Sequence, residues 1–242
     1  MDRLREECPW DQKQTINSLR YLTIEEVYEL SDAILDGNFE EIKKELGDLL
    51  LHVIFYSRIA SEKKVFDIAD VLNTISDKLI HRHPHIYGDV KVKDEKEVKE
   101  NWEKLKLKEG KNSVLEGVPK SLPAVVKAYR IQEKVRGIGF DWENKGQVWD
   151  KVLEEIQELK NEENNNNIDR IEDEFGDVLF AFINYSRFIN INPEDALEKT
   201  NKRFIKRFQF LEKQISADGK QLSDLTFDEM NSYWDLAKKE LS

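Results

Sequence analysis

The chain has 242 residues, of which 36% are charged and 39% are apolar, and its formal net charge is −11. With only 10 glycines and 5 prolines, it has too few turn residues for a β-sandwich or a β-barrel. The negative charge argues against a protein that grips nucleic acid through its phosphates, and the longest apolar run, residues 49–56, is too short to span a membrane. These features predict long amphipathic helices in a protein that binds neither nucleic acid nor a membrane.

The N-terminal segment contains the only cysteine, Cys8, so a disulfide within the chain is not possible. The first residues, MDRLREECPWDQ, are charged and have no apolar core, unlike a secretory signal. A chain with one cysteine and no signal is expected to be soluble and cytoplasmic.

Residues 25–48 carry an acidic pattern, E-E-x-x-E followed by E-x-x-D. Glu26 and Glu29 are three residues apart, and so are Glu45 and Asp48; this spacing places each pair on one face of a helix. Apolar residues recur at three- and four-residue steps beside the second pair, which predicts an amphipathic helix: Ile42, Leu46, Leu49, Leu50, Val53 and Ile54.

A later predicted helix of the first half carries a basic pair, Lys78 and Arg82, and ends in the motif HRHPH at His81–His85. Zinc usually takes three or four ligands from more than one segment, and the chain offers no second cluster of cysteine and histidine. We therefore expect this motif to end the helix, with Pro84 as the stop.

Residues 106–123 separate the two halves of the chain, because this stretch has two glycines, two prolines and no apolar periodicity. Sliding the sequence by 129 positions aligns residues 25–60 with 154–189 without a gap, and 14 of these 36 positions are identical. The fold is therefore predicted to be all-α, with two duplicated helical-bundle domains of about four main helices each. Their predicted bounds are 1–108 and 121–242, joined by a linker over 109–120.

The second repeat carries the same acidic pattern, with Glu155, Glu158, Glu174 and Asp177 at the matching positions. Asn164–Asn167 is expected to form the loop between its two helices. If the helices fold antiparallel across this loop, the four carboxylates meet. Apolar residues again recur at helical steps along the second of these helices: Ile171, Phe175, Val178, Leu179, Phe182 and Ile183.

Four carboxylates in one place favour a divalent cation. Two like charges ~4 Å apart repel by about 4 kcal/mol at an effective dielectric constant of 20, and a bound cation removes this cost. Carboxylate oxygens suit Mg²⁺, or Mn²⁺ as a substitute, better than Zn²⁺. A solvated acidic helix face is the alternative, but surface charge has no reason to recur position by position. A di-iron bundle needs Glu-x-x-His pairs; the only nearby histidine, His52, stands where the second repeat has Ala181 and is expected to be structural.

The two repeats differ in the residues beside the acids. Where the first repeat has Leu22, Glu41 and Phe55, the second has two cations and an amide: Lys151, Arg170 and Asn184. Cations beside the acids favour the binding of an anionic ligand together with the metal ion, and Glu41 opposes it. We therefore expect the main site in the second repeat. A weaker secondary site is expected in the first, formed by Glu26, Glu29, Glu45, Asp48, Lys78 and Arg82.

The last third of the chain is predicted to open a helix at Asn192, with Pro193 in its first position. Arg203 and Arg207 form a basic pair on this helix, four residues apart and so on one face. Trp234 follows near the C-terminus; a late tryptophan is either a core residue or a platform on which a base can stack.

These motifs resemble the MazG family of nucleoside triphosphate pyrophosphohydrolases. The resemblance rests on both acidic signatures and on CPWD (8–11), DKLIHRHPH (77–85), GFDW (139–142) and DEMNSYW (228–234). It implies an all-α enzyme that cleaves nucleoside or deoxynucleoside triphosphates between the α- and β-phosphates, giving a monophosphate and pyrophosphate. It also implies Mg²⁺ as the cofactor and a homodimer whose helices complete a shared bundle.

The family's functional residues map onto this chain by position. The resemblance implies that the metal ligands, and with them the catalytic residues, are Glu155, Glu158, Glu174 and Asp177. It implies substrate binding by Lys151, Arg170, Arg203, Arg207 and Trp234.

Two other functions remain open from the sequence. One is a narrower dUTPase- or dCTPase-like activity, because stacking on Trp234 is indifferent to the base. The other is a non-catalytic helical module that binds a nucleotide or a regulatory partner. The retained cations Lys151, Arg170 and Arg207 argue against this second alternative.

Overall fold

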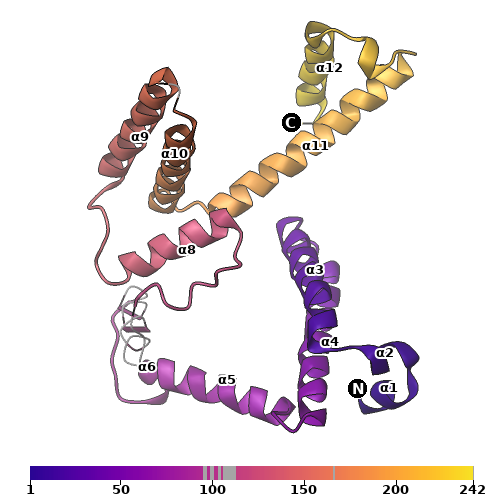
Figure 1. Ribbon diagram of the computed structural model, residues 1–242, viewed down its shortest axis with the longest axis vertical. Coiled ribbons are helices and arrows are strands. Elements are labelled where there is room, and N and C mark those ends of the chain that lie inside the picture. Colours follow the sequence, from indigo (N-terminus) through magenta and orange to yellow (C-terminus); the bar gives the residue numbers. More distant parts are fainter. Residues whose placement is uncertain (95–96, 99–100, 103–104, 106–112, 166, 242) are drawn as a thin grey trace. The chain divides into compact units, whose positions relative to one another are not determined.

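The computed structural model describes residues 1–94, 97–98, 101–102, 105, 113–165 and 167–241. Throughout these residues the regular structure is helical, with no strand, which confirms the predicted all-α class (Figure 1). The chain divides into two compact units, Met1–Glu109 and Gly110–Ser242. Of the predicted linker, residues 109–112 lie outside the described part, and residues 113–120 contain no helix. Within the described chain, no helix is both long and apolar enough to cross a bilayer.

The first unit is built on two long helices, α3 (Ile16–Leu35) and α4 (Phe39–Glu62), which fold back on each other. Asn38 caps α4 by accepting a hydrogen bond from the amide of Glu41 at 3.3 Å. Gly37 takes the left-handed conformation, with φ +66°, that this tight turn requires. The other helices of the unit are α5 (Ile68–Arg82), which is also long, and the short helices α1 (Asp2–Glu7), α2 (Pro9–Lys13) and α6 (Pro84–Tyr87). Helix α5 therefore ends before Pro84, as predicted.

The second unit repeats this helical pair as α9 (Lys145–Asn165) and α10 (Ile168–Phe188). Asn167 caps α10 in the way that Asn38 caps α4. The predicted Asn-rich loop is shorter than expected, because Asn164 and Asn165 still belong to α9; Asn166 lies outside the described residues. The remaining helices are α8 (Ala124–Arg136), α11 (Pro193–Ala217) and α12 (Phe227–Glu240), with a short 3₁₀ turn at Leu222–Asp224.

Helix α11 begins as the sequence predicts. The side chain of Asn192 accepts hydrogen bonds from the amides of Glu194 (3.0 Å) and Asp195 (3.4 Å), and Pro193 is the first helical residue. Helix α12 packs against α11, and α8 contacts both α10 and α11. The described part of the first unit has three long helices and the second unit has five, where about four each were predicted. The repeat itself covers only the acidic pair and the basic helix that follows, so the other helices are free to differ.

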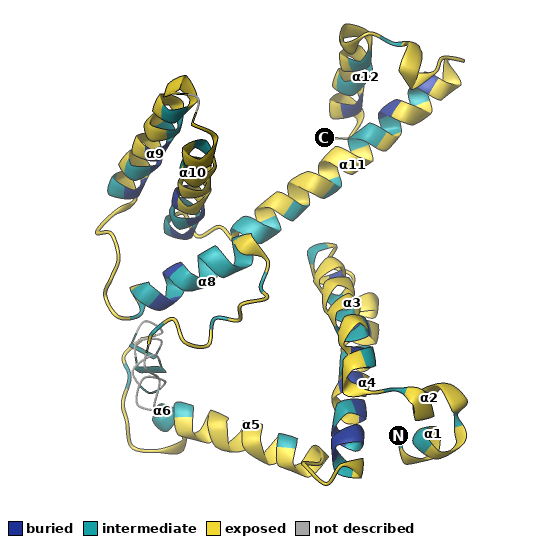
Figure 2. Ribbon diagram, viewed as in Figure 1, coloured by how far each residue is buried: buried dark blue, intermediate teal, exposed yellow. Residues whose placement is uncertain are grey.

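The apolar stripes of the acidic pairs are only partly covered. Val148, Val152 and Val178 are buried between α9 and α10, whereas Phe175 and Leu179 of the same stripe are 54% and 50% exposed. Figure 2 shows long exposed runs on both helices of this pair. In a pair of helices, each helix covers only one side of the other. An apolar stripe that is wider than this contact is therefore partly exposed to solvent.

One arginine in each unit, at equivalent positions of the repeat, forms an ion pair with a residue that precedes the acidic helix pair in the sequence. Arg187, at the end of α10, is buried and forms a two-pronged ion pair with Asp141 in the α8–α9 loop, with Nη1–Oδ2 at 2.8 Å. Its counterpart Arg58 pairs with Asp2 of α1 at 3.2 Å. Partial burial raises the pKa of Asp141, but the hydrogen bonds and charge of Arg187 outweigh this effect, so the pKa lies below its ordinary value.

Candidate active site

Three carboxylates converge between the two acidic helices of the second unit. Glu155 comes from α9, and Glu174 and Asp177 come from α10; each offers an oxygen within 4.8 Å of the others. The three-residue spacing places Glu174 and Asp177 on the face of α10 that meets α9. Glu155 is buried, Glu174 is half-buried and Asp177 is exposed, so the cluster runs from the helix contact to the surface.

The fourth predicted ligand, Glu158, lies at the edge of this cluster. It is exposed and is not among the three residues whose oxygens converge. Desolvation, followed by the charges of Glu155 and Glu174, raises the pKa of Glu158. A raised carboxyl pKa is the expected effect of crowding negative charges, and a cation among them reverses it.

Lys151 supplies positive charge to the cluster. Its Nζ lies 2.7 Å from Glu155 Oε1 and 2.8 Å from Glu154 Oε1. Hydrogen bonds to Glu154 and Glu155 raise the pKa of Lys151 above its ordinary value. The predicted substrate-binding lysine is therefore next to the predicted metal ligands, one helical turn ahead of Glu155.

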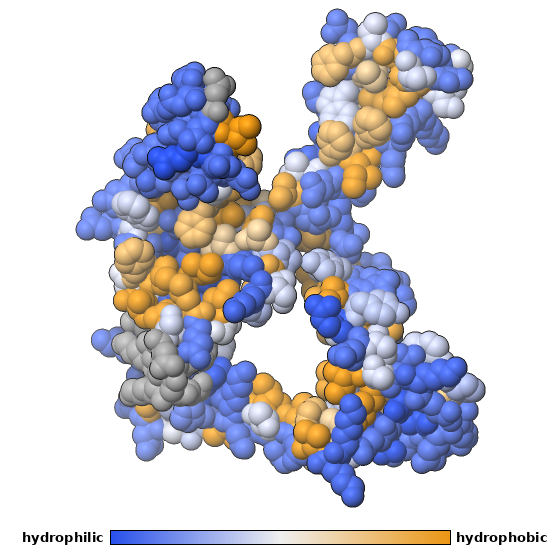
Figure 3. Space-filling model, viewed as in Figure 1, coloured by the Kyte–Doolittle hydropathy of each residue, from blue (hydrophilic) through white to orange (hydrophobic). Residues whose placement is uncertain are grey.

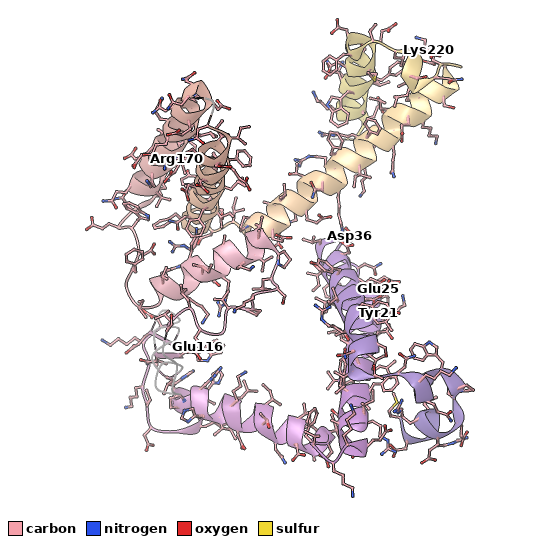
Figure 4. The ribbon with its side chains drawn as sticks, in the orientation of Figure 1. Tyr21, Glu25, Asp36, Glu116, Arg170 and Lys220 are labelled. Atoms are coloured by element: carbon pink, nitrogen blue, oxygen red, sulfur yellow. The ribbon has the colours of Figure 1, made fainter. Side chains whose placement is uncertain are left out.

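The other predicted substrate-binding residues of α10 are held by neighbours. Arg170 is exposed on the side toward α9, with its Nε 3.9 Å from Glu162 (Figure 4). Asn184 is half-buried, and its side-chain oxygen accepts a hydrogen bond of 2.8 Å from Arg187.

Arg203 and Arg207 lie on α11 and Trp234 lies on α12, and these two helices pack against each other (Figure 1). Arg203 is exposed and donates to the hydroxyl of Thr200 at 3.2 Å. The Nε of Arg207 is buried and has no hydrogen-bond partner among the described residues. Trp234 is half-buried on α12. The part that these three residues take in substrate binding stays a prediction.

The first unit contains a matching acidic cluster. Glu26 and Glu29 of α3 and Glu45 of α4 converge within 4.8 Å. Desolvation and then the charge of Asp48 raise the pKa of Glu26, so all four predicted acids are close together. Glu45 is 3% exposed, and its Oε2 is buried with no hydrogen-bond partner among the described residues.

The cations of the first unit are arranged differently from those of the second. Lys44 Nζ is 3.3 Å from Glu45 Oε1, so the counterion comes from the neighbouring residue and not from the turn ahead of Glu26. The predicted basic pair lies on α5, where Lys78 is exposed in a shallow groove and Arg82 is half-buried.

The donors of both clusters suit a hard divalent cation. Every converging atom is a carboxylate oxygen, and no histidine or cysteine of the described residues joins either group. Oxygen-only donors are typical of Mg²⁺, Mn²⁺ and Ca²⁺. The unpartnered oxygen of Glu45 is the kind of buried polar atom that such an ion satisfies.

Comparison with known proteins identifies the family. The model of the MazG nucleotide pyrophosphohydrolase domain matches the chain twice, over residues 14–87 and 145–209. The chain belongs to the MazG family. Each match contains one acidic pair, so the MazG domain is duplicated, and the chain is an enzyme of this family.

Three relatives of this MazG chain match it over nearly its whole length. The nucleoside triphosphate pyrophosphohydrolase/pyrophosphatase MazG of Thermotoga maritima is 42% identical, covering 98% of this chain and 92% of the relative. The nucleoside triphosphate pyrophosphohydrolase of Escherichia coli K12 is 39% identical, covering 99% of this chain and 95% of the relative. The uncharacterized protein YabN of Bacillus subtilis is 42% identical, covering 96% of this chain but 48% of the relative.

No histidine among the described residues of this MazG chain is a member of either acidic cluster. His52 is buried beside Tyr56, with ring centroids 6.4 Å apart, and its Nδ1 has no hydrogen-bond partner among the described residues. In the HRHPH motif, His83 Nδ1 is 2.7 Å from the carbonyl oxygen of Leu79, so it completes the end of α5.

Sequence reasoning missed three contacts in the second unit of this MazG chain. The alignment of residues 25–60 with 154–189 places Arg58 opposite Arg187, but it does not identify Asp141 as the partner of Arg187. It also missed Glu154, which shares Lys151 with Glu155, and Phe204, whose ring packs on Trp234. The repeat pattern and the GFDW motif were the available signals, but neither identifies which residues meet in space.

Proposed function

We propose that the second unit hydrolyses nucleoside triphosphates between the α- and β-phosphates, using a divalent cation held by Glu155, Glu174 and Asp177. The observation that carries this proposal is the convergence of these three carboxylates from two helices, with Lys151 beside them. The family and the activity named for its relatives support the same reaction.

Hydrolysis of the phosphoanhydride needs an acidified water and neutralised phosphate charge. The water oxygen bonds to phosphorus, the bridging P–O bond breaks, pyrophosphate leaves and a proton is released. A magnesium ion in the acidic cluster supplies Lewis acidity and charge neutralisation for this step. Lys151 lies where its ammonium can contact the phosphates, and Arg170 adds positive charge one turn ahead of Glu174. Glu158, at the rim, completes the acidic set.

Product analysis tests this reaction. With ATP and Mg²⁺, the chain is expected to release AMP and pyrophosphate, and chelation with EDTA is expected to stop the release until Mg²⁺ or Mn²⁺ is restored. ADP with phosphate contradicts the proposal, and so does activity that persists after chelation. A panel of common NTPs and dNTPs separates broad activity from a dUTPase- or dCTPase-like one. Complete inactivity on this panel with either metal favours a non-catalytic module.

We also propose that the chain is a homodimer in which two α9–α10 pairs form a four-helix bundle. Leu153, Phe175, Leu179 and Phe182 are between 42% and 54% exposed on this pair. Hydrophobic side chains reach its surface between polar ones (Figure 3). A second copy of the pair supplies the missing half of the core, as in four-helix bundles generally.

A charge on this stripe is expected to separate the protomers. Leu179→Lys replaces a half-exposed apolar residue, and burying such a side chain contributes about 1.5–3 kcal/mol. Since the change occurs once in each protomer, the dimer dissociation constant is expected to rise by about a hundredfold or more. Sedimentation over a concentration series measures it. Asp173→Lys, at an exposed position of α10 outside the apolar stripe, is the matched control and is expected to leave the dimer intact. A monomeric wild-type chain, or equal effects of the two variants, contradicts the proposed interface.

A further inference from the structure

Three aromatic rings gather where α12 packs on α11. The ring centroids of Phe204 and Trp234 are 4.9 Å apart with the planes tilted by 48°. Phe208, one turn further along α11, stacks nearly parallel to Phe204 at 6.1 Å. Phe204 remains 56% exposed, and Trp234 is only half-buried, so the cluster is open to solvent on one side. Such a platform suits a flat ligand.

The turn of the hairpin fixes the backbone next to Trp234. The hydroxyl of Tyr233 donates to Asp218 at 2.6 Å, and Lys220 Nζ lies 5.8 Å from the centroid of the Tyr233 ring. Figure 4 shows Lys220 at this end of the hairpin. These contacts hold the helix that carries Trp234 but do not set the plane of its indole. Phe204 is the ring in contact with that plane.

Two cations lie in the row beside these aromatics. Arg203 and Arg207 are four residues apart on α11, and Phe204 and Phe208 follow each of them directly. On a helix this spacing gives two adjoining rows, one cationic and one aromatic. Phosphates are bound by cations of this kind, and bases stack on aromatic faces. The combination suits a nucleotide whose base and phosphates lie side by side.

We propose that Phe204 is a positioning residue that sets the plane of Trp234 for stacking on the nucleotide base. The proposal rests on the proposed function and deepens it, because it assigns how the base half of the substrate is held. Phe204 acts through Trp234, while Arg203 and Arg207 act on the phosphates. Base contact and phosphate contact are therefore separable on α11.

The first unit differs at this position. Its basic pair, Lys78 and Arg82, is followed by Leu79 and His83 in place of Phe204 and Phe208. Leucine is apolar but gives the neighbouring ring no planar partner. Phe204→Leu therefore transfers the first unit's residue into the second and keeps an apolar side chain there.

Binding of two ligands tests the proposal. Titration calorimetry with α,β-methylene-ATP reports base and phosphates together, and inorganic tripolyphosphate reports phosphates alone. In Phe204→Leu, the dissociation constant for α,β-methylene-ATP is expected to rise about tenfold, because stacking contributes substantially to binding. The constant for tripolyphosphate is expected to stay unchanged. For ATP turnover, KM is expected to rise with little change in kcat. Phe204→Tyr restores a planar ring and is expected to restore binding.

Other outcomes overturn the proposal. If both constants rise together, Phe204 supports the whole pocket and not the base; if neither rises, it has no role in binding. Leu79→Ala is the matched control and is expected to leave both constants unchanged. Because these ligands are not turned over, the result is independent of product analysis. If the wild-type chain binds both ligands but releases no pyrophosphate from ATP, the proposed function is contradicted and the role of Phe204 in binding is not.

Discussion

Replacing Glu155 by glutamine is expected to lower the rate of pyrophosphate release by about a hundredfold or more, since losing only an outer partner of a metal ligand costs about 10–100-fold. Glu155 is the buried member of the acidic cluster and lies between Lys151 and the acids of α10. Glutamine has nearly the same shape as the Glu155 side chain but carries no charge. The change therefore weakens cation binding and still fills the space between the two helices. An assay of pyrophosphate release from ATP with Mg²⁺ measures this rate, and thermal melting shows whether the variant keeps its fold.

Glu26→Gln is the matched control, because Glu26 is the counterpart of Glu155 in the first unit. It has no lysine one turn ahead, since Leu22 stands there. This variant is expected to lose less than about half of the activity. Equal losses in the two variants contradict the assignment of the main catalytic site to the second unit.

Replacing Arg187 by methionine is expected to destabilise the second unit by about 3 kcal/mol. The Arg187 side chain is 5% exposed and its partner Asp141 is 21% exposed, so the variant leaves a carboxylate with little access to water. The Nε of Arg136 lies 3.7 Å from Asp141 Oδ2 and compensates part of the charge of this carboxylate. Native-state hydrogen exchange of the α9 and α10 amides measures the effect in this unit alone.

The effect of Arg187 depends on pH. Because the pKa of Asp141 lies below its ordinary value in the folded protein, the ion pair stabilises fully above a pH of about 4. This contribution is lost as the pH falls through the lowered pKa. The difference between the wild-type chain and Arg187→Met is therefore expected to narrow in acid. A difference that stays constant down to low pH contradicts this account.

Arg58→Met is the matched control in the first unit. The Arg58 side chain is 31% exposed, and its two partners, Asp2 and Glu62, are 77% and 32% exposed, so solvent reaches both carboxylates and screens these pairs. Its loss is expected to cost less than about 1 kcal/mol. A cost as large as that of Arg187→Met means that burial of the pair is not what makes Arg187 important.

The acidic clusters could be predicted well because their information is local. Two residues three apart share a helix face whatever the rest of the fold does. The packing of α10 against α9 then brings Glu155 close to Glu174 and Asp177. The same spacing predicts Glu158 as a ligand, but its side chain is exposed and its oxygens do not join the converging three. Spacing gives the face of a helix and not how far each side chain reaches.

The apolar stripes show where local information ends. Periodicity correctly predicted α4 and α10, yet Phe175 and Leu179 are half-exposed, where a core position was the natural expectation. Periodicity identifies an apolar face but not the partner that covers it. In the proposed homodimer, a second copy of the chain covers the exposed apolar face of the α9–α10 pair.

The sequence by itself determined the helical class, the duplication and the family, since each depends on composition, period and motif order along the chain. It also determined which residues carry the charge: the acids of both repeats and the cations favouring the second. Only the tertiary structure decided which of these side chains meet. It joined Lys151 to Glu155, Arg187 to Asp141 and Phe204 to Trp234. The last two pairings link residues 46 and 30 positions apart, and such contacts depend on how helices pack, which no local pattern records.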